Sequence, residues 1–255
     1  MMVHEEPSKL RNLLIEFVTS MRLVEYCDSL YLVGSYSSGD VLISSDIDII
    51  IIVRNDDAIR TVSKIFEEFR SQIEPMLDIR VYTRDSFNKA NNGLDHFSIW
   101  SNIQSGLLII GSPIAVKLKP NLVKAGLLHW IDRIDESICH LEVHTQFEGT
   151  CFLLYSALVW FFFIDKHLIH EYKGKISKVG ALRNVFGDMQ ETISLNYEKT
   201  LQKIRKKKIN QGEKIRFKET RRWSEVEYSM LLGIAEDVNE YGNEILLKVS
   251  NRYGV

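Results

Sequence analysis

Short apolar runs mark candidate strands in the first half of the chain. Residues 30–33 and 107–110 are apolar and of strand length, and Ile47–Val53 is almost entirely β-branched, which favours buried strands. Residues 76–82 alternate between apolar and polar side chains, the period of two that is typical of a strand. We therefore expect a sheet of short strands that is largely buried.

Helical spacing surrounds these runs. Behind Pro7 and Ser8, apolar residues recur every three or four positions from residue 10 to residue 21, which predicts a first helix that covers one face of the sheet. A second helical segment runs from about residue 56 to residue 73, before Pro75 and the alternating strand. A strand, a helix and a strand in this order favour an α/β arrangement.

The pattern changes after residue 110. Gly111, Ser112 and Pro113 interrupt it, and strand-like alternation largely disappears beyond them. The candidate helices that follow are residues 122–147, 150–167, 175–186, 189–207 and 224–249. We expect an N-terminal domain at residues 1–112, with a mixed sheet flanked by helices, and an all-α domain at residues 113–255.

Candidate chemistry lies where the first two strands meet their loops. Gly34 directly follows the first apolar run and lets the backbone turn its N–H groups toward an anion, while Ser35 adds a hydroxyl donor. A helical turn at residues 36–39 would point its N-terminus at the same anion. After a gap of ten residues, Asp46 and Asp48 flank one isoleucine, so alternation along a strand places both carboxylates on one face.

Two carboxylates on one face repel each other unless a cation neutralises them, and oxygen ligands favour Mg²⁺ or Mn²⁺. Asp78, on the alternating strand, is expected beside this pair and would complete a site for two metal ions that activates an attacking hydroxyl. Arg80 shares the face of Asp78 and either balances its charge or contacts a phosphate. Solvated strand acids and an ordinary turn are the structural alternatives.

Together, Gly-Ser, the gap of ten residues, Asp-Ile-Asp and a later strand aspartate resemble the DNA polymerase beta superfamily of nucleotidyltransferases. The resemblance covers about residues 10–112. It implies that the Gly-Ser turn binds the triphosphate, that the paired aspartates bind two Mg²⁺ ions, and that the third aspartate binds the catalytic metal and helps to activate the acceptor hydroxyl. By position in the motif, these residues are Gly34 and Ser35, then Asp46 and Asp48, then Asp78.

The same resemblance extends to the organisation of the chain. Residues 96–111 resemble the helix and closing strand that end the small nucleotidyltransferase domains. In the superfamily a helical domain often follows the catalytic module, where it forms the other wall of the cleft or a dimer interface. A homodimer is therefore one expected assembly.

Composition favours a soluble cytoplasmic enzyme. The chain has 255 residues, of which 45% are hydrophobic and 26% charged, enough to bury a sizeable core. Glu5 and Glu6 stand where a secretion signal would be cationic, and the longest apolar run, residues 151–164, is shorter than the roughly 20 residues that span a bilayer. Three widely separated cysteines form neither a disulfide framework nor a zinc pattern.

Charge is unevenly distributed although the formal net charge is only −2. Residues 199–222 contain eleven Lys and Arg against two Glu, a local net charge of +9. Such a segment can attract a polyanion through counterion release, or it can be a solvated helical hairpin. It makes nucleic acid a candidate partner without supporting sequence-specific readout.

We expect an enzyme that uses Mg²⁺ to transfer a nucleoside monophosphate from an NTP to a hydroxyl of a small-molecule or protein acceptor, with release of pyrophosphate. The first alternative is an RNA 3′-end nucleotidyltransferase that uses residues 199–222. The second is a non-catalytic NTP-binding or antitoxin-like partner protein. Fold and motif alone do not choose the acceptor.

Overall fold

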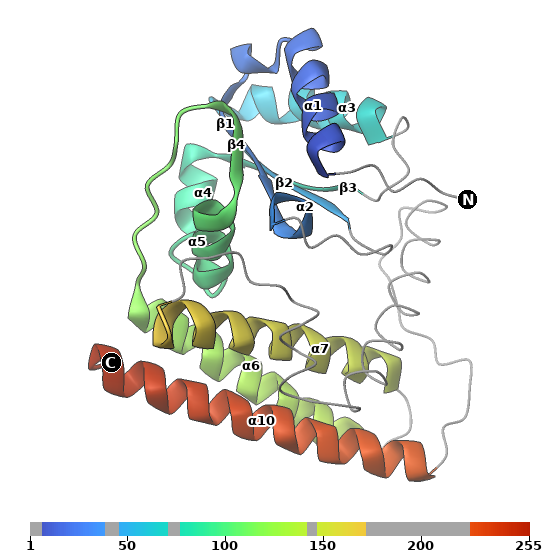
Figure 1. Ribbon diagram of the computed structural model, residues 1–255, viewed down its shortest axis with the longest axis vertical. Helices are drawn as coiled ribbons and strands as arrows, with labels where there is room; N and C mark the ends of the chain where they lie inside the picture. The colour runs from blue at the N-terminus through green and yellow to red at the C-terminus, as the bar shows by residue number, and fades with distance from the viewer. Residues whose placement is uncertain (1–6, 39–45, 71–76, 142–146, 172–224) are drawn as a thin grey trace. The chain divides into compact units, whose positions relative to one another are not determined.

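The computed structural model describes residues 7–38, 46–70, 77–141, 147–171 and 225–255 (Figure 1). The chain divides into two compact units, Met1–Leu118 and Lys119–Val255. The predicted domain limits, residues 1–112 and 113–255, stay a prediction. The predicted helices at residues 175–186 and 189–207 and the basic segment at residues 199–222 lie outside the described residues.

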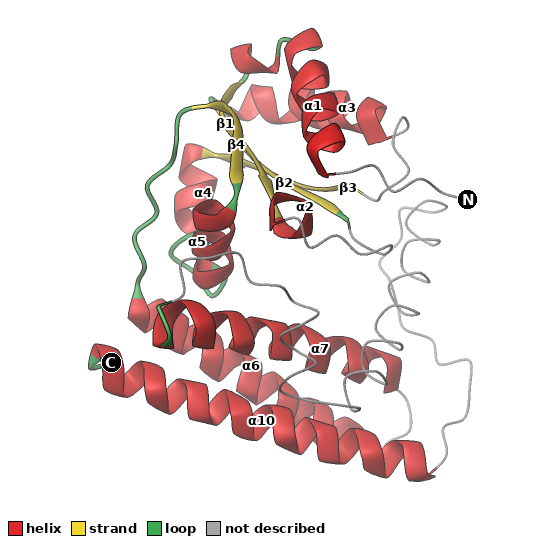
Figure 2. Cartoon of the chain, viewed as in Figure 1, coloured by secondary structure: helices red, strands yellow, loops and turns green. Residues whose placement is uncertain are grey.

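A mixed four-stranded sheet forms the centre of the N-terminal unit (Figure 2). Its strands are β1 (Cys27–Val33), β2 (Ile47–Val53), β3 (Leu77–Thr83) and β4 (Leu107–Gly111), in the order β3-β2-β1-β4. β1 is antiparallel to β2 and to β4, whereas β2 and β3 are parallel and are joined by helix α3 (Asp56–Arg70). The helix is needed because parallel strands cannot be joined by a tight hairpin.

Each face of the sheet has its own hydrophobic core, because side chains alternate along β2. The odd-numbered residues from Ile47 to Val53 pack with helix α1 (Pro7–Ser20) and α3, where Phe17 stacks on Phe69 at 4.2 Å between ring centroids. The even-numbered Ile50 and Ile52 pack with helices α4 (Arg84–Ala90) and α5 (His96–Ser105). Figure 1 shows the two helix pairs on opposite sides of the sheet, so the prediction that the first helix covers one face is confirmed.

The sequence predicted most of these elements. β2 has the predicted bounds, while β1 begins three residues before the predicted start at residue 30. Helix α4 was not predicted, although Thr83 and Ser86 form a capping box at its start, in which each side chain binds the other residue's backbone N–H. The short elements α2 (Gly34–Ser38) and η1 (Leu23–Glu25) complete the unit.

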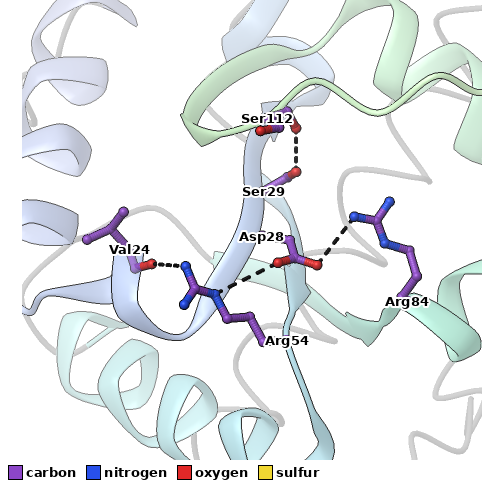
Figure 3. A network of polar contacts seen from close by, with 6 residues as sticks. All are labelled: Val24, Asp28, Ser29, Arg54, Arg84 and Ser112. Carbon is purple, nitrogen blue, oxygen red and sulfur yellow. Dashed lines mark hydrogen bonds and ion pairs between the residues drawn. The ribbon is translucent and has the colours of Figure 1, made fainter.

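A polar network ties together the strand ends that lie farthest from Gly34 (Figure 3). Asp28, near the start of β1, forms ion pairs with Arg54 at 3.9 Å and Arg84 at 3.3 Å, which follow β2 and β3. Ser29 donates its hydroxyl to the carbonyl oxygen of Ser112, just after β4, at 2.5 Å. The network therefore joins all four strands at this end of the sheet.

Helices make up the described part of the C-terminal unit. They are α6 (Pro120–Leu141), α7 (Phe147–Ile164), the π-helix η2 (Asp165–Ile169) and α10 (Glu225–Tyr253), and α10 packs against both α6 and α7. Gly242 of α10 allows close packing, because a Cβ there would lie 2.5 Å from Cε2 of Phe161. Among the described residues, no helix is both long and apolar enough to cross a membrane.

Candidate active site

Gly34 forms the turn at the end of β1. Its φ of +68° lies in the left-handed region, which strongly favours glycine. A Cβ at this position would lie 2.2 Å from Oδ2 of Asp48, so there is also no room for a side chain. Glycine is thus required for two reasons, its backbone conformation and the lack of space. The carboxylate of Asp48 lies directly against the turn.

Strand register brings Asp48 and Asp78 together. Asp48 of β2 is aligned with Val33 of β1 on one side and with Asp78 of β3 on the other. Aligned residues of neighbouring strands project toward the same face of a sheet, here the face that carries Ile50 and Ile52 and is covered by α4 and α5. Asp46 directly precedes β2, two residues before Asp48.

Asp78 has a cationic neighbour. Oδ2 of Asp78 lies 3.8 Å from Nη2 of Arg80, and the two side chains are 42% and 44% exposed. An ion pair this open to solvent contributes little to stability, about 0 to 1 kcal/mol. Of the two roles expected for Arg80, charge balance for Asp78 is the one that this geometry favours.

Ser35 and its neighbours anchor the turn. Helix α2 begins at Gly34, two residues before the predicted helical turn at residues 36–39. Ser35 is buried, Tyr36 packs into the core on the α1 and α3 side, and Ser37 donates its hydroxyl to the carbonyl oxygen of Gly34 at 2.8 Å. The residues after Gly34 are therefore fixed by burial and by one side-chain hydrogen bond to the backbone.

The donor set fits magnesium in its chemistry. Asp48 and Asp78 on adjacent strands, and Asp46 just before β2, offer carboxylate oxygens, the ligand type that Mg²⁺ prefers. Within the described residues, however, no group of three or more acidic, histidine or cysteine side chains is gathered closely enough to hold a metal ion. The register brings Asp48 and Asp78 to adjacent positions, and the metal roles of the three aspartates stay predictions.

One further residue near the turn was not singled out from the sequence. Gly106, between α5 and β4, lies against Val33, the residue that precedes the Gly34 turn. A glycine between a helix and a strand is usually explained by the end of the helix. The structure adds a second explanation, because the α-carbon of Gly106 lies close to the side chain of Val33.

Part of the chain matches a known protein family. Residues 13–103 match a family model described as a nucleotidyltransferase domain. The match begins within α1, ends within α5 and includes every residue of the Gly-Ser and aspartate motif. A search of curated proteins finds no match to the chain. The N-terminal part of this chain, at residues 13–103, therefore belongs to the nucleotidyltransferase domains of the polymerase beta superfamily.

Proposed function

We propose that this protein is a Mg²⁺-dependent nucleotidyltransferase that transfers a nucleoside monophosphate from an NTP to a hydroxyl of a small-molecule or protein acceptor. One observation carries the proposal. Asp48 stands opposite Asp78 in the parallel strand pair while its carboxylate lies against the left-handed Gly34 turn. A turn suited to phosphate thus adjoins carboxylates suited to a metal, within a nucleotidyltransferase domain.

In the reaction, the acceptor oxygen forms a bond to the α-phosphorus, and the bond from that phosphorus to the oxygen bridging to the β-phosphate breaks. Pyrophosphate leaves, and Asp78 takes the proton of the hydroxyl. Backbone N–H groups at Gly34 and Ser35 hold the triphosphate, while Arg80 orients the Asp78 carboxylate. When bound by Asp46, Asp48 and Asp78, two Mg²⁺ ions would offset the charge of the triphosphate.

A label-transfer experiment tests the proposal. The protein is incubated with each α-labelled NTP, Mg²⁺ and a lysate of the source cell, and the labelled product is separated into RNA, protein and small molecules. We expect Asp48→Asn to lower transfer by roughly 100-fold or more, because the lost carboxylate serves the reacting phosphate. Asp57→Asn, an exposed aspartate on α3, is the matched control and should transfer normally.

Two results would reject this function. Transfer that survives Asp48→Asn would mean that the activity does not use this site. NTP binding without label transfer or pyrophosphate release, for every NTP, would favour the non-catalytic binding protein.

The cysteines support a reducing compartment such as the cytoplasm, because Cys27 and Cys139 are free thiols.

A nucleic-acid acceptor is the second candidate, and the charge of +9 in residues 199–222 favours it. A polyanion acceptor should lose affinity steeply as salt is raised from about 50 to 200 mM, since binding releases counterions. Reversing the charges at residues 206–208 should also lower the affinity for a polyanion acceptor. A small or protein acceptor whose recognition does not involve this segment should be nearly indifferent to that change.

A further inference from the structure

Gly106 is not required by its backbone conformation. It caps the C-terminus of α5 with φ of −72° and ψ of 154°, an extended conformation that any residue adopts. Glycine at this position therefore has to be explained by the space around its α-carbon. Conformational strain gives no reason for it.

That space is closed on two sides. A Cβ on residue 106 would lie 2.5 Å from the carbonyl oxygen of Asn102 and 2.9 Å from Cγ1 of Val33. It would also lie 3.4 Å from the carbonyl oxygen of Leu32, whose register partner in β4 is Leu107. Any side chain at residue 106 must therefore push on the last turn of α5 or on the end of β1.

The end of β1 is also the start of the candidate active site. Val33 is buried in the core beneath α4 and α5, it precedes Gly34 in the chain, and it is aligned with Asp48 across the strand pair. Gly34 in turn leaves no room for a Cβ beside the Asp48 carboxylate. A continuous line of close contacts therefore runs from Gly106 through Val33 to Gly34 and Asp48.

Close packing makes this line of contacts sensitive to small changes. Protein interiors transmit a displacement of one group to its neighbours because few voids are left to absorb it. Val33 cannot move away from residue 106 without carrying the Gly34 turn or altering its pairing with Asp48. A methyl group added at residue 106 should thus displace the Gly34 turn, which directly follows Val33.

We propose that Gly106 is a positioning residue for the Gly34 turn and the Asp48 carboxylate. Because glycine has no side chain, Val33 can take the position in which Gly34 contacts the carboxylate of Asp48. The effect on turnover rests on the proposed nucleotidyltransferase function, whereas the effect on the turn does not. If Gly106 only completed the end of α5, an added methyl group would lower stability and leave the turn unchanged.

The test compares Gly106→Ala with Gly93→Ala. Gly93 lies in the same unit, and a Cβ there would meet its nearest atoms at 3.5 and 3.8 Å, which is ordinary contact. Two readouts are used on the full chain: the backbone amide resonances of Gly34, Ser35 and Asp48 in ¹H–¹⁵N spectra, and kcat and KM for label transfer. Gly106→Ala should shift those resonances and lower kcat about 10-fold or more, because misplaced catalytic groups are costly. Gly93→Ala should do neither.

A second substitution tests the route through Val33. In Gly106→Ala with Val33→Ala, the Cγ1 atom that the new methyl would meet is gone, so the Gly34 and Ser35 resonances should return toward those of Val33→Ala alone. If Gly106→Ala fails to fold, Val33→Ile fills the same space from the other side and should shift the same resonances.

The outcomes separate the two proposals. Unshifted Gly34 and Ser35 resonances in folded Gly106→Ala, or shifts equal to those of Gly93→Ala, would overturn the positioning role whatever the activity. The role would also be overturned if Val33→Ala failed to restore the resonances, since the effect would then run through α5. Absence of transfer by the unmutated protein would reject the nucleotidyltransferase function and leave the resonance test decisive for Gly106.

Discussion

Cys27, at the start of β1, has a thiol whose ionisation is opposed by its surroundings. Burial raises the pKa of Cys27 from its ordinary value of 9.0 to about 12, with Arg54 lowering it and Asp28 raising it to smaller extents. A raised pKa in the folded state stabilises the protein fully below pH 9, and that stabilisation is lost as the pH rises from 9 toward 12. The loss reaches about 4 kcal/mol over the whole interval, at about 1.4 kcal/mol per pH unit.

The prediction is a pH dependence that disappears with the thiol. Between pH 7.5 and 10.5 the free energy of unfolding of the N-terminal unit should fall by about 2 kcal/mol more in the unmutated protein than in Cys27→Ala. Urea unfolding of both proteins at both pH values measures this difference. Because the other groups that titrate in this range are the same in the two proteins, their contributions cancel. Cys139→Ala, which removes an exposed thiol, is the control and should keep the full pH dependence. Equal slopes in the unmutated protein and Cys27→Ala would contradict the prediction.

Two glycines show which local features could be predicted from the sequence and which could not. A sharp turn at Gly34 was predicted, and its φ of +68° lies in the left-handed region that favours glycine. The second reason, the carboxylate of Asp48 against the α-carbon, depends on the pairing of β1 with β2. Gly106 could not be singled out, because its contact with Val33 joins residues that are far apart in the sequence and leaves no local pattern.

At the scale of elements, prediction succeeded where hydrophobic periodicity was uninterrupted. β2 was predicted with its observed bounds, since its isoleucines form one apolar run. The first three residues of β1 were missed because Asp28 and Ser29 interrupt the run, although both are satisfied by contacts with other strand ends. Polar residues at a strand end can thus belong to the strand when tertiary contacts supply their partners.

The strand-end network should contribute modest, salt-sensitive stability. Asp28→Asn removes the charge that pairs with Arg54 and Arg84, whose side chains are 56% and 55% exposed. We expect a loss of about 1 kcal/mol in the free energy of unfolding at low salt, and roughly half of that at 0.5 M salt, because exposed pairs are screened. Urea unfolding at both salt concentrations measures it, with Glu16→Gln, an exposed charge inside α1 and away from its first turn, as the control. A loss that is the same at both salt concentrations would show that the charge is not responsible.

At the scale of the whole molecule, sequence predicted a change from mixed strands and helices to helices alone. Among the described residues, strands occur only in the N-terminal unit, and the C-terminal unit is helical. Helix ends were less predictable, since α7 begins at Phe147 and its predicted continuation to residue 167 becomes the π-helix η2. Register and crossover in the sheet depend on pairing between distant segments, which periodicity in one segment does not encode.

Each compact unit has fully buried side chains of its own, and we therefore predict two unfolding transitions. Phe66 of α3 and Phe161 of α7 are both fully buried, each in a different unit. Truncating either to alanine removes the same side chain and should cost about 3 to 5 kcal/mol in its own unit. If each unit unfolds on its own core, Phe66→Ala should lower only one thermal transition, by roughly 10 °C or more, and Phe161→Ala only the other. Differential scanning calorimetry of the full chain distinguishes the cases, because a single transition lowered by both substitutions would require the two cores to unfold as one cooperative unit.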